Sequence, residues 1–395
     1  MSRWQQLKNI YHFGQAQAWR WWYGRPDRGL HLYGITGTNG KTTTSYILAS
    51  ILAAAYGRKH VGLLTTVAFW VGEDEIINAT KMTTLPSRLI FFYLWRMRRA
   101  GVSHVVMEIT SHALDQHRLA GVLLAGGIVL NISREHLDYH RTMTAYAAAK
   151  ERLLNYLADG APLVGKEDDP YVSRILTAAR ESSRQVIPFT AVQAHAVATP
   201  LPGEVNRENA LAATLLAQAC RVPAAAIAAG IAAVKNVPGR MEWLALKNGV
   251  QVLIDYAVTP GALTALYRDV RATTKGKIYA VLGAAGQRDR GKRPAMAAAV
   301  ATYADEIVLT REDPWRENEE QIFSDLERGL QTTDKSWRRI VDRTAALRYC
   351  LQRAQAGDVI VATGKGAERG MGIGSKVIPW HEKTVIGQLA EELGQ

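Results

Sequence analysis

The sequence predicts an α/β fold with two domains, each built on a mostly parallel, doubly wound sheet, the second of them Rossmann-like. Strand-like runs alternate with helix-like runs after residue 30, and a glycine-rich loop joins the first strand to the next helix. A break at Pro238 and Gly239 is followed by four more strand-like runs. We therefore expect an N-terminal segment at 1–29, a central domain at 30–237 and a C-terminal domain at 238–395.

The N-terminal segment differs from the rest of the chain. It carries six of the large aromatic residues, Trp4, Tyr11, Trp19, Trp21, Trp22 and Tyr23, and its net charge is +4 (five basic residues minus Asp27). A helix is expected up to Gly24. It either packs on the body of the protein or lies against a membrane surface or a protein partner through residues 1–23.

The central domain shows the alternation first. Its runs LHLYGIT (30–36), VSHVVMEI (102–109) and GGIVLNI (126–132) are typical of buried strands. The runs 42–57 and 144–158 are expected to be helices, the second a single helix of high propensity. In the C-terminal domain, the runs 250–257, 277–286, 305–310 and 357–364 are expected to be strands.

Bulk composition excludes several classes of protein. The 395 residues are 48% hydrophobic and 21% charged, which is typical of a globular protein. The two cysteines, Cys220 and Cys350, are too few for a disulfide framework or a cysteine-rich zinc site, and favour a reducing cytoplasm. The longest apolar run, 119–130, is too short to span a bilayer. A net charge of +12 (48 − 36) suits nucleic acid, an anionic membrane or anionic small substrates.

The glycine-rich loop has the context of a phosphate site. It follows a strand, opens a helix, and has the spacing G-x-x-x-x-x-G-K-T from Gly34. Its backbone amides and the helix N-terminus favour phosphate oxygens. Lys41 adds a charge at the β- and γ-phosphates, and a threonine supplies a hydroxyl to magnesium. The expected contacts are Gly37, Thr38, Asn39, Gly40, Lys41, and Thr42 or Thr43.

Carboxylates and histidines follow the next two strands. Glu108 ends the run at 102–109, where an open α/β sheet binds its ligands and where a carboxylate can hold Mg²⁺. The polar residues after the run at 126–132 are Asn131, Glu135, His136, Asp138 and His140. Lys150 lies in the helix beyond them, and its helical position alone indicates a surface lysine.

The C-terminal domain offers a second polar edge. Asp255 ends a strand and can accept hydrogen bonds from a ribose. The loop GAAGQRDRGKRP (283–294) carries four cations and suits a phosphate or a carboxylate. The turn GKGAERG (364–370), with Glu368, is a weaker candidate for an amine or carboxylate contact.

Together these pieces resemble the Mur ligase family, and within it the branch that makes tripeptide precursors. The resemblance runs from about Gly34 to Lys383. The motifs that carry it are GTNGKTTT, MTTLPSR, MEITSHALDQHR, LNISREHLDYHRTMTAYAAAKERL, NRENALAA, VPGRMEW, VLIDYAVTP, GQRDRGKRP and ATGKGAER.

The resemblance implies an ATP- and magnesium-dependent ligase that adds an amino acid to a peptidoglycan precursor through an acyl phosphate. Small-molecule substrates, and no nucleic acid, are the implied partners. Catalysis and metal binding would fall to Lys41, Thr42, Glu108, His136 and Lys150, the last as a carbamate. Nucleotide contacts would include Asn209, Arg240 and Asp255. Substrate contacts would be Thr83, Thr84, Thr110, Ser111, Gln116, Arg118, Asp313, Gly364 and Glu368.

The sequence departs from the family pattern in three places. The domain that grips uridine is expected to be missing, since about thirty residues precede the first strand. Val258 stands where a histidine is usual. Glu312-Asp313-Pro314-Trp315 replaces the Asp-Asn-Pro-Arg motif that reads diaminopimelate in many relatives. The resemblance therefore leaves both substrates open. The alternatives are an amide ligase with a folate-like or lipid-linked acceptor, and a non-catalytic regulator that binds nucleotide.

Overall fold

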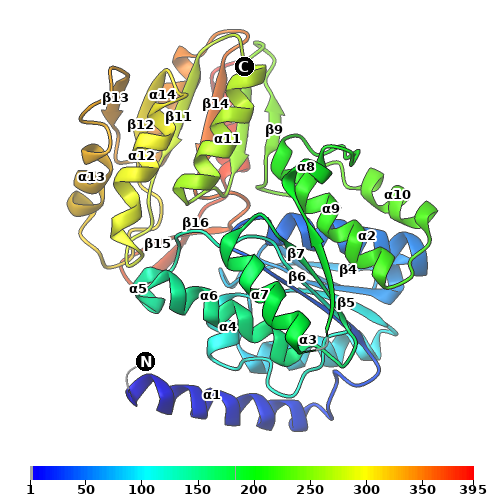
Figure 1. Cartoon of the computed structure of the whole chain (residues 1–395). Helices are drawn as coiled ribbons and strands as arrows, with labels where there is room; N and C mark the ends of the chain where they lie inside the picture. The colour runs from blue at the N-terminus through cyan, green and yellow to red at the C-terminus, as the bar shows by residue number, and fades with distance from the viewer. Residues whose placement is uncertain (1–2, 183) are drawn as a thin grey trace. The chain divides into compact units, whose positions relative to one another are not determined.

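The computed structural model describes residues 3–182 and 184–395, which divide into two compact units (Figure 1). The N-terminal unit comprises Met1–Ser133 and Thr142–Lys235, and the C-terminal unit comprises Arg134–Arg141 and Asn236–Gln395. A short segment from the middle of the N-terminal half thus groups with the C-terminal unit. Within the described residues, no helix is both long and apolar enough to cross a bilayer.

The N-terminal unit is built on an eight-stranded sheet of order β4-β3-β2-β5-β1-β6-β7-β8. The strands are β1 His31–Thr36, β2 Val61–Leu64, β3 Ala68–Val71, β4 Asp74–Ile77, β5 His104–Glu108, β6 Gly126–Val129, β7 Pro162–Lys166 and β8 Gln185–Phe189. Six strands are parallel, and β3 and β4 add an antiparallel meander at one edge.

Helices cover both faces of this sheet. The helices are α1 Arg3–Trp22, α2 Lys41–Tyr56, α3 Ser87–Arg99, α4 Ser111–Asp115, α6 Met143–Glu151, α7 Pro170–Glu181, α8 Ala191–Ala194, α9 Glu204–Ala219 and α10 Ala224–Ala233, with 3₁₀ turns η1 Arg58–His60 and η2 Arg152–Tyr156. One core joins the sheet to α3, α4, α6 and α7, through residues such as Phe91 and Leu114. On the other face, α2 packs against α9 and α10.

The C-terminal unit has a six-stranded sheet of order β13-β12-β11-β14-β10-β9, in which only β9 is antiparallel to its neighbour. The strands are β9 Glu242–Ala245, β10 Gln251–Asp255, β11 Ile278–Leu282, β12 Glu306–Leu309, β13 Ser336–Arg339 and β14 Val359–Thr363, and a separate hairpin pairs β15 Gly370–Ile373 with β16 Lys376–Pro379.

Two cores enclose this second sheet. The helical elements of the unit are α5 Leu137–His140, α11 Pro260–Thr273, η3 Arg290–Lys292, α12 Arg293–Ala301, α13 Glu319–Arg328, α14 Arg343–Arg353 and α15 Glu382–Glu392. Helices α11, α12 and α13 cover one face, with Leu263 and Met296 in that core, and α14 and α15 cover the other, with Leu347. The doubly wound α/β fold predicted from the sequence is confirmed.

The expected single helix at 144–158 is wrong. Helix α6 ends at Glu151, and η2 replaces its last turns. The cause is the neighbouring strand, because the carbonyl of Tyr156 accepts a hydrogen bond from the amide of Leu124 at 2.7 Å and Leu157 bridges to Leu124. Local helix propensity is therefore overridden by pairing with the chain that enters β6.

Candidate active site

The glycine-rich loop between β1 and α2 has a defined shape. Gly40 adopts φ 85°, and a Cβ atom there would lie 2.3 Å from Oδ1 of Asn209 on α9. Asn131, just after β6, also contacts the loop. Its side-chain Oδ1 accepts a hydrogen bond from the backbone amide of Asn39, and its backbone carbonyl accepts one from the backbone amide of Thr38, both at 2.8 Å. The loop is thus fixed at the N-terminus of α2, where the helix dipole favours an anion.

Lys41 begins α2 and its side chain turns back over the loop. Its Nζ donates to the carbonyl of Gly37 at 2.9 Å and to that of Thr38 at 2.8 Å. Thr42 and Thr43, the next two residues, are both 4% exposed. The ammonium is therefore held over the loop at the N-terminus of α2.

Lys150 is not the surface lysine that its helical position alone indicates. It is 1% exposed, and its Nζ donates to the carbonyl of Gly37 at 2.8 Å. The same Nζ lies 4.7 Å from the ring centre of Tyr146, whose hydroxyl is 3.1 Å from Oγ1 of Thr38. Two lysines from different helices thus converge on one carbonyl of the loop, an arrangement that the sequence spacing did not show.

Glu108 ends β5, the strand beside β1, and is 2% exposed. Its register partner in β1 is Ile35, so it reaches the same edge of the sheet as the loop. Its two carboxylate oxygens accept from the amide of Thr66 at 3.0 Å and from the hydroxyl of Thr66 at 3.2 Å. Thr66, which no sequence motif indicated, therefore orients this carboxylate.

The residues expected to contact the acceptor join the same network. The Oγ1 atoms of Thr66 and Thr83 are 3.0 Å apart, and the hydroxyl of Thr84 donates to the carbonyl of Glu108 at 2.9 Å. Arg118 donates to the carbonyl of Thr84 at 2.6 Å. The guanidinium of Arg118 also donates twice to the side-chain oxygen of Gln116.

Two further members of that set lie at the start of α4. The amide of Thr110 donates to Oγ1 of Thr84 at 2.9 Å, and the hydroxyl of Thr110 caps α4. Ser111 follows and is 1% exposed. Hydroxyls, an amide and a guanidinium are thus grouped beside a carboxylate within the N-terminal unit.

His136 belongs to the segment that groups with the C-terminal unit. It precedes α5 and adopts the left-handed conformation, with φ 55°. The residues before it are ion-paired: Glu135 accepts from Nζ of Lys292 at 2.9 and 3.0 Å, and Arg134 pairs with Asp289 at 3.0 Å. The segment is therefore attached to the loop 283–294, and His136 lies in a different unit from Glu108 and Lys150.

The cations of the loop 283–294 are mostly engaged within the unit. Arg293 is fully buried and pairs with Glu317 at 2.8 Å and Asp325 at 2.9 Å, and Arg290 pairs with Glu317 at 3.0 Å. Lys292 pairs with Glu135, as above. The interpretation of these three cations as an anion site is therefore not supported, because their charges are neutralised by carboxylates.

Asp255 ends β10 as the sequence indicated, and its oxygens accept from the amides of Met241 at 2.8 Å and Ala257 at 2.7 Å. Burial raises the pKa of Asp255, against the opposing effect of the Arg240 guanidinium and these two amides. The guanidinium of Arg240 lies 4.5 Å from the ring centre of Tyr256. Asp255 therefore organises the backbone at the end of this strand.

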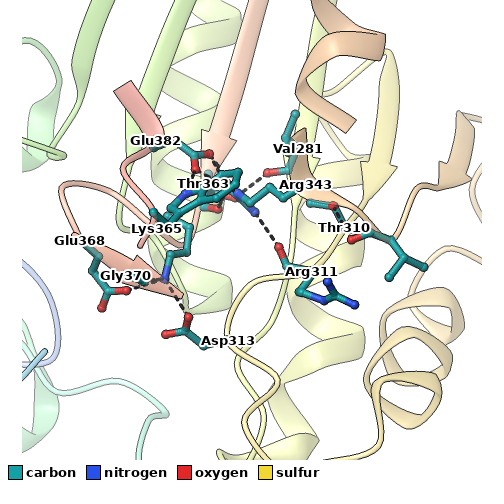
Figure 2. Close-up of polar contacts among 12 residues, drawn as sticks. Val281, Thr310, Arg311, Asp313, Arg343, Thr363, Lys365, Glu368, Gly370 and Glu382 are labelled. Carbon is teal, nitrogen blue, oxygen red and sulfur yellow. Dashed lines mark hydrogen bonds and ion pairs between the residues drawn. The ribbon is translucent and has the colours of Figure 1, made fainter. Parts of the chain in front are cut away.

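Two substrate positions predicted from the sequence, Asp313 and Glu368, meet around Lys365, a residue that the sequence analysis quoted in a motif but gave no role (Figure 2). Lys365 is fully buried, and its Nζ donates to Asp313 at 2.8 Å, to Glu368 at 2.6 Å and to the carbonyl of Gly370 at 2.8 Å. Burial alone would lower the pKa of Lys365, but the carboxylates of Glu368 and Asp313 outweigh it and raise that pKa. Lys365 therefore remains an ammonium.

A second buried ion pair lies beside it in Figure 2, and no motif indicated it. Arg343 and Glu382 are both fully buried, and the guanidinium makes contacts of 2.6, 3.0 and 3.1 Å with the carboxylate. Arg343 also donates to the carbonyls of Thr363 at 2.8 Å and Arg311 at 3.3 Å. The pair joins α14, α15 and the end of β14, the strand that leads to Gly364.

Glu312 is the one carboxylate of this cluster with a buried oxygen that has no hydrogen-bond partner among the described residues. A Cβ atom on Gly364, which adopts φ 98°, would lie 2.5 Å from that oxygen. Burial, and then the charge of Asp313, raise the pKa of Glu312 to about 7, although Lys365 and Arg343 act in the opposite direction. Gly364 therefore leaves room for the Glu312 carboxyl.

Trp315 is fixed against the β15 hairpin. Its amide donates to the carbonyl of Gly372 at 3.0 Å, and its carbonyl accepts from Gly374 at 2.8 Å. A Cβ atom on Gly372 would lie 2.5–2.7 Å from the indole ring, so the ring packs directly on this glycine. The next residue, Arg316, is exposed.

Comparison with known proteins gives these features a context. Residues 35–196 match the Mur ligase middle domain, and residues 239–366 match the Mur ligase glutamate ligase domain. The chain is 35% identical to a UDP-N-acetylmuramyl-tripeptide synthetase of Roseiflexus sp., over 94% of this chain and 81% of the relative. It is also 35% identical to a UDP-N-acetylmuramoyl-L-alanyl-D-glutamate–2,6-diaminopimelate ligase of Geobacillus thermodenitrificans, with the same coverage.

Solved structures agree at the level of the fold. A UDP-N-acetylmuramoyl-L-alanyl-D-glutamate–2,6-diaminopimelate ligase aligns with 93% of this chain and 80% of its own, at 28% identity and a TM-score of 0.59. A folylpolyglutamate synthase of Mycobacterium tuberculosis aligns with 89% of this chain and 92% of its own, at 18% identity and a TM-score of 0.69. At that identity the second similarity shows the fold alone.

Proposed function

This chain belongs to the Mur ligase family, and from that premise we propose that it joins an amino acid to a muramyl-peptide nucleotide with the consumption of ATP. The observation that carries the proposal is the buried Lys150 on the phosphate loop. A phosphate loop by itself serves many nucleotide-binding proteins. A second lysine, removed from water and bonded to the same Gly37 carbonyl as Lys41, is an arrangement for chemistry at the bound phosphates.

The ATP phosphates fit the loop at the N-terminus of α2, with Lys41 on the β- and γ-phosphates. The contacts proposed there are Gly37, Thr38, Asn39, Gly40, Thr42 and Thr43. Asn209 is placed to support this site, since its Oδ1 accepts from Thr44 on α2 at 3.2 Å and limits position 40 to glycine. Arg240 and Asp255 are the nucleotide contacts proposed in the C-terminal unit.

Magnesium would be held by oxygen ligands of mixed origin. Within residues 3–182 and 184–395, no three His, Cys, Asp or Glu side chains gather as a metal site. The donors of the N-terminal unit that fit are Glu108, the hydroxyl of Thr42 and a carbamate on Lys150. His136 is the further metal ligand that the family resemblance implies. A carbamate keeps one N–H, so Lys150 would retain its hydrogen bond to Gly37. Bound there, Mg²⁺ would neutralise charge on the phosphates.

The reaction we propose has two steps. A carboxylate oxygen of the acceptor attacks the γ-phosphorus of ATP, so that ADP leaves and an acyl phosphate forms. The amine of the incoming amino acid then attacks the acyl carbon, and phosphate leaves as the amide bond forms. In this chain, Lys41 binds the transferred phosphoryl group, and Thr83, Thr84, Thr110, Ser111, Gln116 and Arg118 hold the acceptor.

The incoming amino acid is assigned to the C-terminal cluster of Asp313, Gly364 and Glu368, in which Lys365 aligns both carboxylates. The protein would act in the cytoplasm, where the nucleotide substrates are available. A different acceptor, such as a folate, is not favoured by any contact described above.

Product analysis tests this function. Purified protein, ATP and Mg²⁺ would be incubated with UDP-N-acetylmuramoyl-L-alanyl-D-glutamate and a mixture of amino acids, and the nucleotide products weighed by mass spectrometry. We expect a species heavier by one amino acid less water, formed only with ATP. If ATP is consumed and no muramyl product forms, while a folate or lipid-linked acceptor is extended, the proposed acceptor is wrong.

A further inference from the structure

Helix α1 exposes an apolar face. It lies along the outside of the N-terminal unit beside α3 (Figure 1). Among the residues from Lys8 onward, Asn9 and Ala16 are buried. The large apolar residues on its outer side are exposed by 47–77%: Ile10, Tyr11, Phe13, Trp21 and Trp22. The placement of Trp4 lies outside the described side chains.

A separate set of contacts fixes α1 to the unit. The ring of Tyr23 lies 6.1 Å from those of Phe92 and Trp95 on α3, and stacks on Trp19 at 6.2 Å. Arg20 makes two hydrogen bonds to Asp27, of 2.9 and 2.8 Å, which close the turn after the helix. Phe13 also lies 6.0 Å from the ring of His117. Ile10, Trp21 and Trp22 nevertheless remain 62–77% exposed, and their exposure needs another reason.

The same two helices carry most of the excess charge of the protein. Neither α1 nor α3 contains an acidic residue. Residues 3–28 and 87–99 together hold nine basic residues and one acidic residue, a net +8 of the +12 of the whole chain. The basic residues are Arg3, Lys8, Arg20, Arg25, Arg28, Arg88, Arg96, Arg98 and Arg99.

The arginines lie among the aromatic rings. The guanidinium of Arg25 is 3.8 Å from the ring centre of Trp21, and that of Arg99 is 5.0 Å from Trp95. Arg98 and Arg99 are both exposed at the end of α3. Rings that reach into acyl chains next to cations that bind headgroup phosphates are the features of a helix lying in a membrane interface.

We propose that α1 and α3 form a docking surface for an anionic lipid bilayer, with α1 in the plane of the interface. Since none of the described helices is long and apolar enough to cross a bilayer, the contact would be peripheral. The charge complements phosphatidylglycerol or cardiolipin headgroups, and the exposed Ile10, Phe13, Trp21 and Trp22 supply the apolar contact. Nucleic acid would match the arginines but leaves the aliphatic and aromatic face of α1 without a partner.

Vesicle sedimentation of the full chain tests the proposal at physiological salt. Vesicles of phosphatidylcholine with about 30% phosphatidylglycerol, an anionic lipid, would be compared with pure phosphatidylcholine and with a DNA duplex. Two variants remove the surface, Trp21→Ala/Trp22→Ala and Arg98→Gln/Arg99→Gln. Their matched controls are Trp337→Ala, at an exposed tryptophan, and Arg207→Gln/Lys235→Gln, which remove two exposed charges elsewhere.

We expect binding to the anionic vesicles, weaker at higher salt, and a loss of at least about tenfold in both surface variants but not in the controls. ATP-dependent ligation of soluble substrates should be unchanged in all four, which shows that they are folded. Absence of binding to anionic vesicles, an equal loss in the controls, or binding to DNA without binding to vesicles would each overturn the proposal.

Discussion

At the scale of single residues, Lys150 is the side chain whose environment differs most from its position in the sequence. An alanine-rich helix suggests a solvated lysine, whereas the structure buries its Nζ against the carbonyl of Gly37 and the ring of Tyr146. A carbamate would replace this positive charge with negatively charged oxygen atoms, which are the ligands that Mg²⁺ prefers. This residue is therefore the place to test the proposed chemistry.

We expect Lys150→Ala to be inactive, and the activity of the wild-type protein to fall when dissolved CO₂ is removed. Small carboxylates should partly restore the variant, because they supply the missing oxygen ligands. Lys166→Ala is a control, since Lys166 is a half-buried lysine of the same unit that pairs with Glu208 at 2.9 Å. Full activity of Lys150→Ala would refute the carbamate.

Lys41 is expected to act on the transferred phosphoryl group. Lys41→Ala should lower kcat by roughly 10²–10³-fold, the usual effect of removing a transition-state charge contact. Its fold should be retained, since the residue lies at a helix start and contributes little to the core. Circular dichroism and ATP turnover measure the two effects, and near-normal turnover in a folded Lys41→Ala variant would remove the phosphate-loop assignment.

Glu312 gives a prediction for stability against pH. Its pKa is raised from 4.5 to about 7 by burial, so the protonated form is favoured in the folded state. The stability that this carboxyl contributes is therefore full below about pH 4.5 and is lost as pH rises through 7. The glutamine of Glu312→Gln stays neutral. The free energy of unfolding of this variant, relative to that of the wild-type protein, should therefore rise by on the order of 3 kcal/mol between pH 5 and pH 8.

Urea unfolding at the two pH values measures that gain, with Glu391→Gln, at an exposed position, as the control. If the difference in free energy of unfolding between Glu312→Gln and the wild-type protein is the same at pH 5 and pH 8, Glu312 is already ionised in the folded protein at pH 5.

At the scale of elements, prediction from the sequence succeeded where local pattern and burial agree. The run ending at Glu108 and the glycine-rich loop between strand and helix were found in place, because a buried parallel strand has a continuous apolar sequence. The helix expected at 144–158 ends at Glu151, because the backbone hydrogen bond from Leu124 to Tyr156 competes with continuation of the α-helix. The meander of β3 and β4, with Thr66 before it, had no clear periodic signal.

Ion pairs between residues far apart in the chain could not be predicted from the sequence either. Arg343 and Glu382 are 39 positions apart, and Lys365 and Asp313 are 52 apart. Charged residues at such separations give no periodic pattern, and only the packing of α14, α15 and β14 brings them together. Likewise, Glu135 and Lys292 are 157 positions apart, and their contact explains why the segment around His136 groups with the C-terminal unit.

The segment that includes Trp315 and its hairpin gives a prediction for the incoming amino acid. An indole cannot make the bidentate contact of a guanidinium to a carboxylate, and this indole is packed on Gly372. The carboxylate of Glu368 favours an amine instead. We therefore expect kcat/KM to be higher for lysine or ornithine than for meso-diaminopimelate, and Trp315→Arg to shift the ratio toward meso-diaminopimelate. A wild-type preference for meso-diaminopimelate that vanishes in Arg316→Ala would mean that the clamp lies one position later.

At the scale of the whole molecule, the net charge of +12 could not identify a binding partner from the sequence, because a charge count does not say where on the surface the charges lie. The structure places two thirds of it on α1, the turn after it and α3, and pairs most cations of the loop 283–294 internally. The two α/β units and the order of their motifs followed from the sequence, since strand–helix alternation is a local pattern. The grouping of Arg134–Arg141 with the second unit depends on tertiary contacts.

The central claim is that the acceptor carboxylate is phosphorylated by ATP before the amine attacks. It is tested most directly with an acceptor whose reacting carboxylate carries two ¹⁸O atoms, followed by mass spectrometry of the phosphate released. The account predicts one ¹⁸O atom in each phosphate formed together with amide product. The amine attacks the acyl carbon, so the bond between that carbon and the bridging oxygen breaks and the bridging oxygen leaves with the phosphate. Amide product accompanied by phosphate that carries no ¹⁸O would contradict the account, because the phosphate would then come from attack of water on ATP.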